Sequence, residues 1–279
     1  MLKRTSILAV SLVCAITIGA FLMQPQATAQ LTDQVGDLVR SLEDPNPPNR
    51  NAAFYQLLGI GYGSDMHGRT YHIPSALANL YKQSPDKADD IKIALIRLLE
   101  KENAFTQAHR KEYEQTGNTL SEAYVDYYGD LIASVAALKD ERALNALLGA
   151  INTGNMVTRA LAGFGTYALD QILGKLSDPD STTRSSAATV LRQMLEPGNV
   201  KKVGDAVSKG KIKEAFIGAT RDNDPYVRLA GVEGLAALGD HSVIPLIENL
   251  AQNDSFEGFG RERPYPVREA ARKALEKLR

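Results

Sequence analysis

The chain has 279 residues, a formal net charge of −1 and a charged fraction of 23%. This near balance of charge excludes a broad basic face, so we expect no nucleic-acid partner. The length exceeds what one ordinary compact core holds, whereas a repeat architecture grows unit by unit, so we expect one elongated domain built from repeats.

The N-terminus has the features of a secretory signal peptide. Two basic residues precede an apolar run over residues 7–23, and Ala27-Thr28-Ala29 offers a small-residue cleavage site. The run is shorter than the roughly 20 apolar residues that span a bilayer, so a retained anchor is the alternative. We predict that residues 1–29 are removed and that residues 30–279 are periplasmic or secreted, with no membrane contact after cleavage. Cys14, the single cysteine, would leave with the signal.

A repeated pattern organises the remainder of the chain. Five segments each carry an Arg, a small residue three places later and, in four of them, a Leu seven places later. A small residue at one helical position lets two helix backbones approach closely, and the Leu fills the space between units. The pattern predicts stacked helical repeats. The Arg residues are Arg50, Arg159, Arg184, Arg228 and Arg268, the small residues are Ala53, Ala162, Ala187, Gly231 and Ala271, and the seventh residues are Leu57, Thr166, Leu191, Leu235 and Leu275.

The segment at residues 59–74 departs from this pattern and is expected to form a polar surface loop. Insertions of this kind are where repeat proteins often place binding residues. Arg69, together with Tyr62 and Tyr71, is therefore a candidate ligand contact.

The same segment contains Asp65, His67 and His72, which are residue types that bind metals. Their spacing lacks the i, i+4 arrangement that places two histidines on one helix face. We therefore predict no metal and no cofactor, and keep a metal-dependent activity at His67 and His72 as an alternative.

Two degenerate units follow, at residues 86–100 and 126–140, which brings the expected total to about seven helical pairs. In the second, Tyr128 stands where the other units have Arg. Tyr124 and Tyr128 are one helical turn apart, which favours packing against a longer neighbouring helix over a ligand site.

The clearest unit, residues 221–250, predicts a helix, a turn and a second helix. Asp224 suits an N-cap and Pro225 the first helical position, while Gly239 suits the end of the helix. Asp180, Asn46 and Asn155 stand at the position of Asp224 in other units and are expected to act as N-caps too.

A second insertion, residues 253–266, combines aromatic residues with arginines, the types that dominate contact energy in protein interfaces. It is our candidate binding loop. The alternative is that its aromatic rings pack back against the fold as a small satellite core. The candidate residues are Phe256, Phe259, Arg261, Arg263 and Tyr265.

The clearest unit resembles the HEAT-repeat family, and its short repeats are similar to those of phycobilisome lyases. The resemblance implies an all-α, α-α superhelix (an α-solenoid) that binds proteins on a curved inner face. It implies that the polar columns bond between neighbouring units and carry no reaction. The matching residues are Asp222, Asp224, Val227, Arg228, Gly231, Gly234, Leu235, Leu238, Gly239 and Asp240, and the polar columns comprise Asp180, Asp224, Arg184, Arg228 and Arg268.

Taken together, these features predict an exported, non-catalytic scaffold that binds a protein partner. No nucleophile motif or paired carboxylates stand out, so we assign no catalytic residue. An alternative that the resemblance allows is a lyase-like enzyme holding a tetrapyrrole on its concave face. The export signal opposes it, because that chemistry is expected in the cytoplasm.

Overall fold

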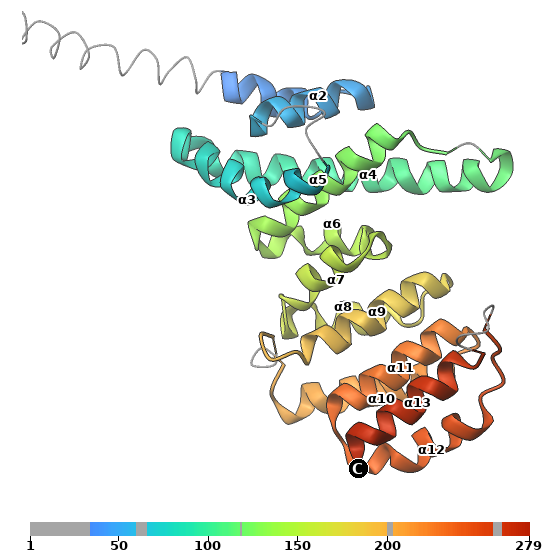
Figure 1. Cartoon of the computed structure of the whole chain (residues 1–279). Helices are drawn as coiled ribbons and strands as arrows, with labels where there is room; N and C mark the ends of the chain where they lie inside the picture. Colours follow the sequence, from blue (N-terminus) through green and yellow to red (C-terminus); the bar gives the residue numbers. More distant parts are fainter. Residues whose placement is uncertain (1–33, 60–65, 118, 200–202, 259–263) are drawn as a thin grey trace, which may run out of the picture. The chain divides into compact units, whose positions relative to one another are not determined.

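The computed structural model is all-α over the residues it describes, which confirms the predicted fold class (Figure 1). No helix in these ranges is sufficiently long and apolar to cross a bilayer. The predicted signal peptide, residues 1–29, lies outside them. The described residues are 34–59, 66–117, 119–199, 203–258 and 264–279.

The chain divides into two compact units, Met1–Ala137 and Leu138–Arg279. In a repeat protein each helix contacts only its neighbours, so a single run of repeats can form separate compact groups. Unit 1 contains a helix at residues 34–41, α2 (Pro47–Leu58), α3 (Met66–Gln83), η1 (Pro85–Lys87), α4 (Ala88–Thr116) and α5 (Glu122–Leu138), which ends at the boundary.

Unit 2 consists of short helices that follow one another as pairs. Helix α11 packs against the preceding α10 and also against α9 and α13, the first helices of the adjacent repeats. This is the stacking that the repeated pattern predicts. The elements are η2 (Glu141–Ala143), α6 (Leu144–Gly149), η3 (Ile151–Thr153), α7 (Asn155–Ala162), α8 (Thr166–Lys175), α9 (Ser181–Met194), α10 (Ala206–Ala219), α11 (Pro225–Leu238), η5 (His241–Val243), α12 (Ile244–Asn253) and α13 (Pro266–Leu278).

The small-residue column has the role that the sequence predicts. A Cβ added at Gly231 would lie 2.8 Å from the backbone nitrogen of Thr220 and 3.0 Å from the carbonyl oxygen of Phe216. One added at Gly234 would lie 2.2 Å from the Phe216 ring. The α11 backbone therefore sits against the end of α10 at a distance that only glycine permits.

The predicted surface loop at residues 59–74 is helical from Met66 onward, because α3 begins there. Ile73, Leu77 and Leu80 are buried along one face of this helix at spacings of four and three residues. The glycines and Pro74 of the segment favour a loop, but burial of this stripe stabilises the helix despite the proline within it.

The predicted N-caps separate into two groups. The side chains of Asp180 and Asp224 each accept hydrogen bonds from the first turn, as expected. Asn46 stands at the N-cap position of α2, but its side chain accepts no hydrogen bond from the first turn, where Pro47 and Pro48 lack N–H donors. Asn155 lies within α7, after Gly154, and is not a cap.

Candidate binding surfaces

Two arginines of the repeat pattern join successive units in the same way. The Nε and Nη2 of Arg184 donate to the two carboxylate oxygens of Asp222, each at 2.8 Å, and Nη1 donates to the carbonyl of Asp178. Arg228 repeats this with Asp254 at 2.7 and 3.2 Å, and with the carbonyl of Asp222. Each guanidinium thus bonds both to the turn before its own helix and to a carboxylate of the following repeat. These two arginines are therefore structural, as the family resemblance implied.

A third example is buried in unit 1. Arg50 donates through Nη1 to the carbonyl of Asp44 and through Nε to Glu102 at 2.6 Å. The side chains of Arg50 and Glu102 are 3% and 0% exposed. The hydroxyls of Tyr124 and Tyr127 also donate to the Glu102 carboxylate, at 2.7 and 3.2 Å. Burial and the adjacent carboxylate raise the pKa of both tyrosines far above the ordinary value, so both remain proton donors.

The tyrosines of α5 pack against α4, as their spacing predicts. The rings of Tyr124 and Tyr128 are stacked with centroids 6.3 Å apart, and the Tyr128 hydroxyl donates to Asn103 at 2.6 Å. The longer neighbour is the 29-residue α4, which also carries Glu102. These rings are therefore part of the core of unit 1.

The remaining two arginines depart from the shared geometry. Arg268 donates from Nε to the carbonyl of Asp254 at 2.6 Å, which joins α13 to the end of α12. Arg159 is exposed on α7. A neutral contact joins α7 to α9, where the Gln193 Nε2 donates to Asn155 at 2.6 Å.

The Arg184 pair makes folding sensitive to acid. The hydrogen bond from Arg184 lowers the pKa of Asp222 below its ordinary 3.8, although burial opposes this. A carboxyl group whose pKa is lowered by folding stabilises the folded state at pH values above its unfolded-state pKa. This stabilisation is lost as the pH falls through the folded-state pKa. We expect the free energy of unfolding to fall below about pH 4, and the fall to be shallower in Asp222→Asn. Urea denaturation across pH 2–7 measures the free energy of unfolding, with a variant of the exposed Asp86, Asp86→Asn, as control. If the free energy of unfolding falls equally steeply with pH in both variants, Asp222 is not the cause of the acid sensitivity.

The second insertion builds an aromatic patch from residues that the structure describes. Phe256 makes an edge contact with Tyr226, with ring centroids 5.9 Å apart, and Tyr226 is 54% exposed. The Arg268 guanidinium lies over the ring of Tyr265, 4.3 Å from its centroid. We call Tyr226 and Phe256 the aromatic patch.

The patch is fixed to the fold at both ends of the insertion. The backbone N–H of Phe256 donates to the Asp254 carboxylate, and the N–H of Gly258 donates to the Pro264 carbonyl at 2.8 Å. Phe256 is half-buried, whereas the exposed ring is Tyr226 from α11. The candidates Phe259, Arg261 and Arg263 lie outside the described residues, so their predicted role stays a prediction.

Of the residues predicted to bind at the first insertion, only His72 has a described side chain, and it is exposed on α3. Tyr62 and Asp65 lie outside the described residues, and the structure describes the backbone but not the side chains of His67, Arg69 and Tyr71. The side chains that are described contain no group of three potential metal ligands. The ligand contact, the metal-dependent activity and the tetrapyrrole-binding activity remain untested predictions.

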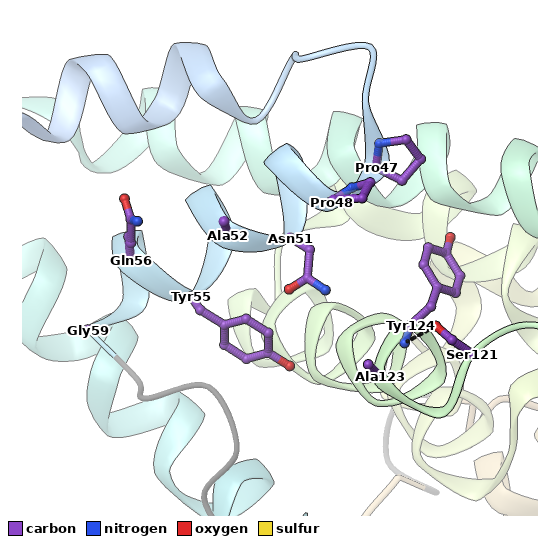
Figure 2. Close-up of a pocket in the computed structure, with 10 residues that line it drawn as sticks. All are labelled: Pro47, Pro48, Asn51, Ala52, Tyr55, Gln56, Gly59, Ser121, Ala123 and Tyr124. Atoms are coloured by element: carbon purple, nitrogen blue, oxygen red, sulfur yellow. Dashed lines mark hydrogen bonds between the residues drawn. The ribbon is translucent and has the colours of Figure 1, made fainter.

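A cleft in unit 1 was not predicted from the sequence. It has a volume of about 700 Å³ and lies between one face of α2, along its whole length, and the start of α5 (Figure 2). The two segments that form it are far apart in the sequence, and no motif marks them. The lining residues are Pro47, Pro48, Asn51, Ala52, Tyr55, Gln56, Gly59, Ser121, Ala123 and Tyr124.

The stacked helices and the bonds between their units define the class: this is a helical-repeat protein. A family model described as "Required for nuclear transport of RNA pol II C-terminus 1" matches residues 169–259, which is less than half of the chain. A search of curated proteins found none that matches the sequence.

Three of the solved structures with some similarity are designed or engineered proteins. A designed armadillo repeat protein, YIII(Dq)4CqI, is 16% identical with a TM-score of 0.42, covering 87% of this chain and 99% of its own. A computationally designed armadillo repeat protein for modular peptide recognition is 15% identical, with a TM-score of 0.44 and the same coverage. An engineered protein is 17% identical with a TM-score of 0.41, covering 88% of this chain and 96% of its own.

Proposed function

We propose that this chain is an exported, non-catalytic scaffold of the HEAT-repeat type that binds a protein partner through the aromatic patch. The observation that carries the proposal is the exposed ring of Tyr226 beside Phe256, at the base of the second insertion. The export part rests on the signal features of residues 1–29, and the HEAT part on the resemblance of residues 222–240.

Exposed aromatic rings of this kind are suited to interfaces. Tyr and Trp are enriched among the residues whose truncation costs most binding free energy, because they bury a large area with few rotatable bonds. Here Tyr226 lies in the first turn of α11, and the turn that precedes this helix is joined to α9 by the Arg184 and Asp222 pair. A ring held on a rigid element loses little conformational entropy when a partner covers it.

The proposal is tested by capture from the compartment in which the protein is expected to act. The mature chain from Gln30, carrying an affinity tag, is incubated with the exported fraction, and bound proteins are identified by mass spectrometry. We expect Tyr226→Ser to reduce recovery of a partner by about thirtyfold, as for an interface residue worth about 2 kcal/mol. The matched control is Tyr167→Ser, because Tyr167 is 51% exposed on α8.

Two results would contradict the proposal. Equal recovery with Tyr226→Ser and wild type would remove the aromatic patch as the binding surface. Recovery of the native protein from the cell interior with residues 1–29 still attached would contradict the proposal that it is exported.

A further inference from the structure

We propose that a groove between α8 and α10 docks an amphipathic helix of a partner protein, one that carries a lysine or arginine beside its apolar face. The groove has a volume of about 680 Å³ and is lined by residues of α8, α10 and the segment that leads into α11. Neither residue of the aromatic patch lines it. This second surface can therefore be tested apart from that patch.

The groove presents apolar side chains to solvent. Leu173 and Leu176, at the end of α8, and Ala215 of α10 are each partly exposed within it. Val207, in the first turn of α10, is 71% exposed. It lies on the same side of α10 as the groove residue Glu214, because seven residues make nearly two helical turns. Exposed apolar side chains on two adjacent helices are suited to the apolar face of a third helix.

Two glycines determine how closely a partner can approach. Gly210 and Gly218 line the groove on α10, and nothing lies within 4 Å of a Cβ added at either. Packing within the described part of the chain therefore does not require glycine there, although glycine is unfavourable within a helix. At Gly231 and Gly234, by contrast, α10 itself lies against the α11 backbone. The side of α10 that carries Gly210 and Gly218 leaves the same close approach open to a helix from outside the chain.

The charge of the groove favours a basic residue on that helix. Lys211 is already paired with Asp170 of α8 at 2.8 Å. Asp222 is likewise held by Arg184. Glu214 is exposed midway between the two glycines, and no side chain among the described residues pairs with it. A lysine or arginine of the partner would supply the counter-charge, whereas an acidic residue would be repelled.

Selection from a peptide library tests this chemistry. The probe is a phage-displayed library of helical peptides of about 15 residues, long enough to form a few helical turns, with one face randomised. It is selected on the full chain. We expect the enriched peptides to carry apolar residues at spacings of three and four, with lysine or arginine beside them. Selection on Glu214→Lys should instead enrich aspartate or glutamate at that position.

Variants then locate the site, with binding of the most enriched peptide measured by fluorescence anisotropy. Gly210→Leu should weaken binding by about twentyfold, because its side chain blocks the close approach, and Val207→Ser by about fivefold. Glu214→Gln should weaken binding by about threefold, as for an exposed ion pair. The fold tolerates Gly210→Leu, because its added Cβ meets open space. Lys209→Leu, exposed on α10 outside the groove, is the matched control and should bind as wild type.

Three outcomes would overturn the proposal. One is a library that yields no peptide specific for the chain, and another is a peptide that binds Gly210→Leu as tightly as wild type. The third is selection of the same charge by wild type and Glu214→Lys. Tyr226→Ser should bind the peptide as wild type does, so failure at this groove is distinguishable from failure at the aromatic patch.

Discussion

Replacing Glu102 by leucine is expected to lower the free energy of unfolding by about 3–5 kcal/mol, the range for removing one partner of a buried ion pair. The cause is the uncompensated charge of Arg50, which is 3% exposed and would lose its carboxylate partner. The hydroxyls of Tyr124 and Tyr127 would lose their acceptor as well. Urea denaturation followed by far-UV circular dichroism measures the change.

Two further variants identify the cause of this loss. Glu102→Gln keeps an acceptor for Tyr124 but removes the charge, so its cost should be intermediate. The double variant Arg50→Met with Glu102→Leu should recover a large part of the loss, because no charge is left buried. A double variant no more stable than Glu102→Leu alone would contradict this explanation.

The second large effect is expected at the α10–α11 contact. Gly234→Ala should lower the free energy of unfolding by about 2–3 kcal/mol, because overpacking exceeds the gain in helix propensity. The new methyl would lie 2.2 Å from the ring of Phe216, which is fully buried. Gly231→Ala should cost a similar amount, since its methyl meets backbone atoms.

A glycine on the neighbouring helix provides the control. Nothing lies within 4 Å of a Cβ added at Gly210 in α10. Gly210→Ala should therefore raise the free energy of unfolding by about 0.5–1 kcal/mol through helix propensity alone. If Gly234→Ala and Gly210→Ala change stability in the same direction, close approach of the two helices is not the reason for glycine at 234.

The repeat could be predicted because its signals are local, whereas the bonds between repeats were implied only by the family resemblance, which did not single out their acidic partners Asp222 and Asp254. Asp224, Pro225 and Gly239 mark one helix within a short segment, and the structure confirms each of these roles. Asp140 and Asp240, the last residues of the degenerate unit and of the clearest motif, both cap the short helix that follows them. The partner of Arg50 could not be predicted, because Glu102 lies within a long helix that lacks the repeated pattern.

The surfaces were harder to predict because they combine distant segments. Tyr226 was assigned only to a helix, and its exposure beside Phe256 depends on how the second insertion folds back. The cleft depends on residues from α2 and α5 that are more than sixty positions apart, such as Asn51 and Tyr124. The start of α3 was missed because Pro74 and the glycines suggest a loop, whereas burial of Ile73 decides the structure.

The most direct test of the scaffold proposal is photo-crosslinking from position 226 in living cells of the source organism. A photoreactive phenylalanine analogue replaces Tyr226, and a second chain carries it at Tyr167 as the control, since both rings are exposed. We predict one discrete protein adduct from position 226 in the exported fraction, lost when Phe256→Ala is added. No adduct at 226, or the same adducts from 226 and 167, would contradict a specific protein partner at the aromatic patch.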